Sequence, residues 1–167
     1  MAKEKVPPIL AVARVAFLLA MGAGMLLMLG SVASSASPVD EATAMINRWT
    51  AAYNANDVEG LVKLYTPDAI VLGTRSPIIS QGPQDIRAYF VSTHLPGSGN
   101  KVEFGERRMM VLGDLRAVLA VGFYNFTLNI GGKMTPSHAR FTWLIVNRGG
   151  SWLIAHHHSS AVPAAPQ

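Results

Sequence analysis

The stretch Gly150-Ser151-Trp152-Leu153-Ile154-Ala155-His156-His157-His158-Ser159-Ser160 predicts the last strand of a small domain and places three histidines on it. Adjacent side chains of a strand point to opposite faces, so His156 and His158 share one face, roughly 6 to 7 Å apart, and His157 lies on the other. The run is short and internal, followed by a Pro/Ala tail, which differs from a purification tag. These histidines are therefore candidate functional groups.

A two-residue turn at Gly149-Gly150 predicts how this strand pairs with the strand before it. The turn pairs Trp143 with His156, so that both share a face with His158. The other face then carries the polar residues of the strand pair: His138, Arg140 and His157. A β-bulge would exchange these assignments, and both arrangements remain open at this point.

Three helices are predicted ahead of this sheet. Apolar residues recur every three or four positions over 39–56, a shorter helix follows at 58–65, and a third at 83–94 has proline in its first turn. Strands follow from about 102 to 160, separated by glycine-containing turns, and a short hairpin at 69–81 precedes the third helix. This order predicts an α+β domain with three N-terminal helices packed on a strongly curved antiparallel sheet, enclosing a conical pocket.

The segment 1–36 has the layout of a secretory signal peptide, with early basic residues, an apolar run over 15–29 and small residues up to Ala36. Two interpretations stay open: a cleaved signal peptide or an uncleaved membrane anchor. In either case we expect a secreted or periplasmic domain over 37–163, with a disordered tail at 164–167. Contact with a membrane is expected only through an uncleaved N-terminal segment.

Composition excludes several classes of protein. Residues 1–36 hold three of the 14 basic and one of the ten acidic residues, so the remainder carries a net charge of +2. That small charge, without a Lys/Arg run, predicts no nucleic-acid partner. The chain has no cysteine, which excludes disulfides and thiolate chemistry. No glycine-rich phosphate-binding motif is present, and we predict no cofactor.

Five phrases resemble the nuclear transport factor two-like superfamily, also called SnoaL-like. They are WTAAYNAND (49–57), LYTPDA (64–69), GPQDIRAYF (82–90), ARFTW (139–143) and the histidine strand (150–160). The last is most similar to the association domain of calcium/calmodulin-dependent protein kinase II and its bacterial relatives. The resemblance implies a cystatin-like α+β cone and favours His156 and His158 as the recurring histidines. The superfamily contains isomerases, cyclases, dehydratases, transport factors and oligomerisation modules, so the fold alone does not select a function.

Several side chains are candidates for contact with a ligand. The aromatic residues Trp49, Tyr53 and Tyr65 are expected to line the mouth of the cone or its core. Arg140 lies among apolar and small residues, where a guanidinium serves either an internal salt bridge or an anion-binding pocket. His138 is a further candidate, but one strand supplies only two histidines to a face, and we predict no metal site.

Two functions follow from these residues. The first is an exported small-ligand-binding and self-associating domain, a homodimer or higher oligomer, whose ligand is a small organic molecule that is anionic or bears a carbonyl group. The alternative is a small enzyme of the isomerase, cyclase or dehydratase type. In that enzyme His156 or His158 would be the general acid/base, and Arg140 with Tyr53 would orient the substrate. No buried carboxylate is predicted, which counts against a ketosteroid-isomerase-like mechanism.

Overall fold

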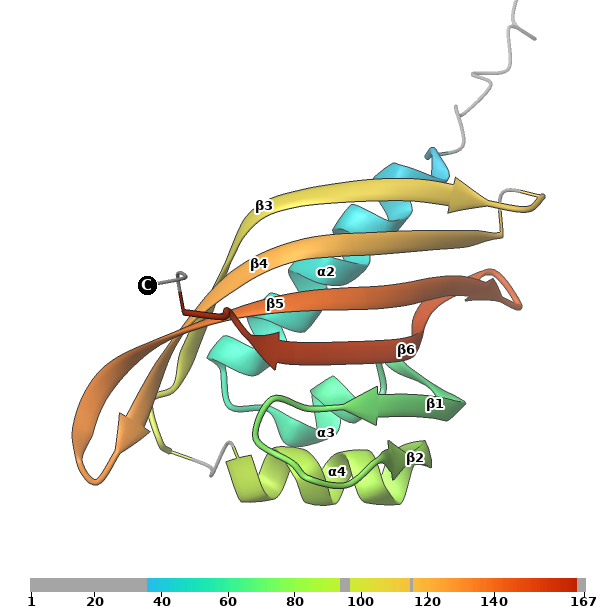
Figure 1. The fold of residues 1–167 in the computed structure, drawn as a ribbon. Helices are drawn as coiled ribbons and strands as arrows, with labels where there is room; N and C mark the ends of the chain where they lie inside the picture. The colour runs from blue at the N-terminus through green and yellow to red at the C-terminus, as the bar shows by residue number, and fades with distance from the viewer. Residues whose placement is uncertain (1–35, 94–96, 115, 165–167) are drawn as a thin grey trace, which may run out of the picture. The chain divides into compact units, whose positions relative to one another are not determined.

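The computed structural model describes residues 36–93, 97–114 and 116–164 (Figure 1). The elements follow in the order α2 (Pro38–Asn54), α3 (Val58–Val62), β1 (Tyr65–Leu72), β2 (Ser80–Gln81), α4 (Gly82–Thr93), β3 (Lys101–Leu112), β4 (Ala117–Ile130), β5 (Lys133–Arg148) and β6 (Ser151–Ala161). The predicted export segment, apart from Ala36, and most of the predicted tail lie outside the described residues. Within the described ranges no helix is long and apolar enough to cross a membrane.

The strands form one six-stranded sheet in the order β2-β1-β6-β5-β4-β3. Strands β3 to β6 make the predicted antiparallel meander, and β1 pairs antiparallel with the short β2. Strand β1 runs parallel to β6, so the sheet is mixed rather than wholly antiparallel as predicted. The α+β class, the three helices and the curved sheet are confirmed.

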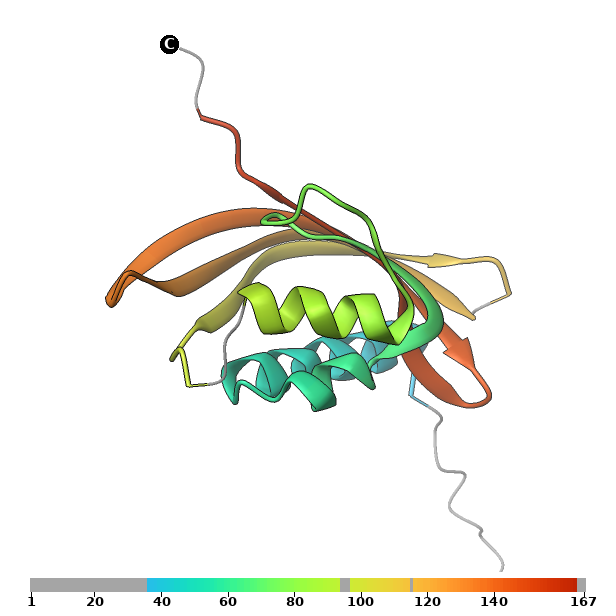
Figure 2. The same ribbon diagram turned by 90° about the horizontal axis from the view of Figure 1, so that it is seen from below.

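The helices lie together on one face of the curved sheet (Figure 2). Helix α2 begins at a capping box, in which the Ser37 hydroxyl accepts from the Asp40 amide and the Asp40 carboxylate accepts from the Ser37 amide. Its buried stripe faces the sheet and consists of Ala42, Met45, Ile46, Trp49 and Tyr53. The predicted amphipathic helix is therefore confirmed, and its apolar face covers the interior of the sheet.

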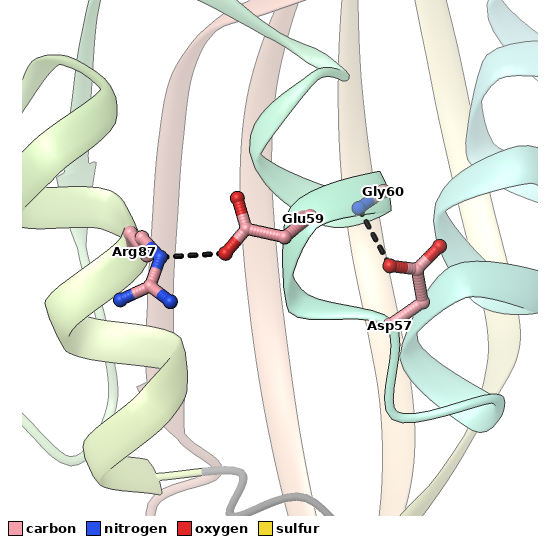
Figure 3. A network of polar contacts seen from close by, with 4 residues as sticks. All are labelled: Asp57, Glu59, Gly60 and Arg87. Carbon is pink, nitrogen blue, oxygen red and sulfur yellow. Dashed lines mark hydrogen bonds and ion pairs between the residues drawn. The ribbon is translucent and has the colours of Figure 1, made fainter.

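Polar contacts at the surface cap helix α3 and link it to helix α4 (Figure 3). The Asp57 carboxylate caps α3 by accepting from the Gly60 amide at 2.8 Å. Glu59 of α3 then pairs with Arg87 of α4, with both side chains more than half exposed. Exposed pairs of this kind contribute at most about 1 kcal/mol, so the pair adds little stability.

The two long hairpins turn at glycine pairs. Gly131 and Gly132 have φ of 61° and 86°, and Gly149 and Gly150 have φ of 61° and 87°. Two consecutive residues with positive φ make the type I′ turn that suits the twist of paired strands. The predicted two-residue turn at Gly149-Gly150 is thus confirmed, and the glycine-containing turn at Gly131-Gly132 has the same form.

The predicted register of β5 and β6 holds near the turn and then fails. Ile145 pairs with Ile154, but the next partner of β6 is His156 opposite Leu144, which leaves Ala155 unpaired as a β-bulge. Trp143 consequently faces His157 rather than His156. One inserted residue has moved all three histidines to the face opposite the predicted one.

Gly122 of β4 lies against the bulged part of β3. A Cβ at this position would come within 2.4 Å of the Glu106 carbonyl oxygen, whereas a Cβ on Gly105 would meet its nearest atom at 3.6 Å. We expect Gly122→Ala to lower the free energy of unfolding by ~1–3 kcal/mol because backbone must move. The matched control Gly105→Ala should lie within ~0.5 kcal/mol of the wild type in chemical denaturation. Equal losses in both variants would contradict the steric explanation.

Candidate functional site

A narrow cavity lies between the inner face of the sheet and helices α2 and α4. The volume in which the centre of a water molecule can move is about 40 Å³, room for a few waters or a small organic group. The lining residues are mostly aromatic, apolar or neutral polar: Trp49, Tyr53, Thr74, Arg75, Tyr89, Phe90, Thr93, Tyr124, Phe126, Leu128, Ser137, Ala139, His157 and Ser159. The cone is therefore largely filled by side chains, with polar groups converging on the space that remains.

His157 is the central polar residue of this wall and is only 3% exposed. Its Nδ1 lies 2.8 Å from the Tyr65 hydroxyl, which in turn accepts from the Trp49 indole N–H at 3.0 Å. Its Nε2 lies 3.4 Å from the Tyr124 hydroxyl. The imidazole thus connects two buried phenols, and its ring also packs against Trp143 with centroids 4.7 Å apart.

Burial controls the ionisation of these groups. It lowers the pKa of His157 from 6.5 to about 3, and the neighbouring His156 and His158 add to the effect. Burial also raises the pKa of Tyr65 and of Tyr124 well above the usual value for a phenol. At neutral pH the buried chain of hydrogen bonds is consequently uncharged.

The mouth of the cavity is formed by the segment after β1. The Thr74 and Ser159 hydroxyls hydrogen-bond each other there. The Tyr89 ring of α4 packs directly against this segment because Gly73 has no Cβ. The nearest ring atom lies 2.2 Å from the position that a Cβ would take. Helix α4 thereby holds the segment against the sheet.

Arg75 is the charged residue of the lining. Within the described ranges no carboxylate lies within 4.0 Å of it. Arg75 and Tyr89 line the cavity together, and the Arg75 charge opposes the rise that burial causes in the pKa of Tyr89. The cavity mouth therefore carries a positive charge beside neutral hydroxyl groups.

Three of the residues predicted to contact a ligand do lie at this cavity or behind it. Trp49 and Tyr53 line it, and both are also part of the hydrophobic core, with rings stacked at 5.1 Å. Tyr65 lies behind the wall, where it connects Trp49 to His157. The structure thus brings together the aromatic residues that the sequence singled out.

The remaining predicted residues lie on the outer face of the sheet. His156 and His158 point away from the cavity because the bulge at Ala155 reverses the predicted alternation. Arg140 lies in an exposed hollow of that face, beside His158, and donates to Ser160 at 3.0 Å. His138 contacts Asn125 on the same face, with Nδ1 2.6 Å from the amide oxygen. The expectation that these four residues line the cone is corrected.

Sequence reasoning missed several groups of the cavity. The predicted register placed His157 on the same face of the sheet as Arg140. Tyr124 was one of several aromatic residues in the predicted strands, and nothing distinguished it from the others. Thr74 and Arg75 lie in a segment without periodicity, so no pattern indicated their position. The available signal for Tyr124 was its position in β4, two residues from both Gly122 and Phe126 on the inner face.

The part of the chain described by the structure holds no group of three or more histidine, cysteine or carboxylate side chains arranged as metal ligands. The cavity wall offers hydroxyl groups, one neutral imidazole and one guanidinium. Such a set can hold a polar atom of a small molecule by hydrogen bonds while aromatic rings surround its apolar part.

The curved sheet covered by helices, with a cavity inside the cone, defines the nuclear transport factor two-like class of α+β protein. Residues 42–165 match the model of the SnoaL-like domain family. The chain belongs to this family. No match is found among curated proteins.

Solved structures agree with this assignment. A protein from Xanthomonas campestris, provisionally described as a calcium/calmodulin-dependent protein kinase II association domain, is 32% identical with a TM-score of 0.68, over 78% of this chain and 95% of that one. An uncharacterised cystatin-like protein from Caulobacter vibrioides is 22% identical with a TM-score of 0.62, over 75% and 90% of the two chains. A provisionally described dehydratase from Streptomyces avermitilis is 15% identical with a TM-score of 0.64, over 76% and 97%. The last two support the fold alone.

The lowered pKa of His157 predicts a specific pH dependence of stability. The His157 imidazole takes up a proton near pH 6.5 in the unfolded chain but only near pH 3 in the folded protein. The contribution of the neutral ring to the free energy of unfolding is therefore complete above pH 6.5 and is lost as the pH falls toward 3. When the pH is lowered from 7.5 to 4.5, we expect the free energy of unfolding to decrease by ~2 kcal/mol less in His157→Gln than in the wild type. Denaturant unfolding at both pH values measures this difference. The exposed-face control His138→Gln should follow the wild type, and a wild-type slope in His157→Gln would contradict the explanation.

Proposed function

We propose that this protein is an exported module that binds a small organic ligand in its cone and associates with itself through the outer face of its sheet. The observation that carries the proposal is the chain of buried hydrogen bonds from Trp49 to Tyr124, which ends at a cavity inside an otherwise apolar core. Buried polar groups cost stability unless they are satisfied, so a network at a cavity wall supports a binding role.

Arg75 supports an anionic or carbonyl-bearing ligand. Its guanidinium has no carboxylate within 4.0 Å among the described residues, and it lies at the mouth of a cavity walled by aromatic rings. A guanidinium in such a place pairs well with a carboxylate or a polarised carbonyl oxygen. The ligand we propose combines a small apolar body with one such oxygen group.

The enzyme alternative is less well supported by the same geometry. His156 and His158, the predicted acid/base residues, lie on the outer face. The histidine inside the cone is His157, and burial lowers its pKa to about 3. A general base works best with a pKa near the working pH, so His157 is a weak base for catalysis at neutral pH. It is better suited to hold neighbouring hydroxyl groups in place.

Self-association is proposed through the outer sheet face because this surface carries exposed large apolar side chains. Ile70 and Leu72 of β1 are 38% and 39% exposed, and Met110 of β3 and Phe123 of β4 are 56% and 48% exposed. Arg140 and His158 lie among them. Apolar side chains beside basic ones on one face are typical of a protein contact surface rather than of a solvated one.

Oligomeric state tests this surface. We expect light scattering coupled to size exclusion to give a dimer or a higher oligomer for the full-length protein, and Phe123→Lys to give a monomer, because the contact would bury a charge. Val39→Lys is the matched control, since Val39 is 37% exposed on α2 on the other face. A monomeric wild type at high micromolar concentration would refute self-association.

Native mass spectrometry of the protein purified from its own host tests the ligand. We expect a retained small molecule in the wild type, and loss of that molecule in Arg75→Ala because the pairing charge is gone. Arg87→Ala is the control, because Arg87 pairs with Glu59 at the exposed surface and is not among the residues that line the cavity. Retention of the molecule by Arg75→Ala at the wild-type level would show that Arg75 has no part in binding.

A further inference from the structure

The hydrogen bonds around His157 donate in one direction, from Trp49 toward Tyr124. The indole N–H of Trp49 can only donate, so the Tyr65 oxygen is its acceptor at 3.0 Å. Tyr65 then has one hydrogen left, and the acceptor available to it is His157 Nδ1 at 2.8 Å. If Nδ1 carried a hydrogen instead, the Tyr65 hydroxyl hydrogen would be buried without that partner, which costs about 1–3 kcal/mol.

The tautomer of the imidazole follows from this direction. A neutral imidazole has one donor and one acceptor nitrogen, so an accepting Nδ1 requires the hydrogen on Nε2. Nε2 faces the Tyr124 oxygen at 3.4 Å and donates toward it. Tyr124 is thereby an acceptor from the core side, and its own hydrogen is directed to the cavity side.

The cavity side of Tyr124 holds two further hydroxyl groups. The Thr74 and Ser159 hydroxyl groups hydrogen-bond each other at the cavity mouth, and Ser159 lines the cavity together with Tyr124. Because these two groups hydrogen-bond each other, neither of them needs the Tyr124 hydrogen. The sequence of donors therefore runs from Trp49 in the core through Tyr65 and His157 to the Tyr124 hydroxyl group, which lines the cavity.

We propose that the cavity selects a ligand whose polar atom is a hydrogen-bond acceptor, a carbonyl or similar oxygen, because the chain from Trp49 presents the Tyr124 hydroxyl group to it as a donor. This inference rests on the proposed binding function and specifies the polarity of the ligand atom at one position. Trp49, Tyr65 and His157 act as positioning residues, while Tyr124 makes the contact. A ligand that offers only an N–H or O–H hydrogen at that position meets another hydrogen and binds poorly.

The tautomer can be measured without any ligand. Nitrogen-15 NMR of the full-length protein labelled at histidine, with His157 assigned from the His157→Gln variant, reports which ring nitrogen carries the hydrogen. We expect Nε2–H at neutral pH. The Nδ1–H tautomer would overturn the proposed direction, whatever the protein binds.

Two five-membered rings test the selection itself. Cyclopentanone offers only an acceptor oxygen and pyrrole mainly a donor N–H, and their affinities are measured by chemical-shift titration of the full-length protein. We expect cyclopentanone to bind the wild type more tightly, and Tyr124→Phe to weaken its binding about tenfold, close to the loss of one hydrogen bond. Binding of pyrrole by Tyr124→Phe should equal that of the wild type.

Controls separate this inference from the broader proposal. Arg140→Gln changes the outer face and should leave the preference for cyclopentanone unchanged, and thermal unfolding shows whether Tyr124→Phe is folded. Equal binding of pyrrole and cyclopentanone would overturn acceptor selection while leaving a ligand-binding cone intact. Failure of both rings to bind would overturn the inference together with the proposed binding function.

Discussion

The interior of this protein depends on the buried imidazole of His157, which joins four elements of the fold. Through Tyr65 it reaches β1 and the Trp49 side chain of α2, and through Tyr124 it reaches β4, while the ring itself belongs to β6. Loss of one partner leaves another buried polar group unsatisfied, which costs more than the hydrogen bond contributes. The same hydrogen bonds therefore connect α2 to the sheet and form the polar wall of the cavity.

The bulge at Ala155 is what brings His157 into that position. It lets Ile154 and His157 both face the core, although they are three positions apart in the sequence, and it sends His156 and His158 outward. Without it the inner face would receive two histidines in place of one. The bulge thus separates an uncharged interior from an outer face that carries histidines and Arg140, and each face is free to serve a different purpose.

Much of the fold was predictable because it follows from local signals. The stripe that includes Trp49 and Tyr53 and the glycine pair at Gly149-Gly150 each indicated the observed element. The parallel pairing of β1 with β6 was not, since it joins segments far apart in the sequence. The predicted placement of the three histidines was wrong for a local reason. Side chains of a strand alternate with a period of two, so one unpaired residue reverses every later assignment. Nothing in Ile154-Ala155-His156 marks the inserted residue.

Neutrality explains how such a site could discriminate among ligands. A charged histidine would have two donor nitrogens and would break the one-way order of hydrogens from Trp49 to Tyr124. Burial holds the pKa of His157 near 3, so the order persists through neutral and mildly acidic conditions. The outer histidines lie in a more exposed setting, on the face proposed for self-association. The groups that give the cavity wall its polarity are therefore separate from the groups that form the proposed contact surface, because the bulge at Ala155 assigns them to opposite faces.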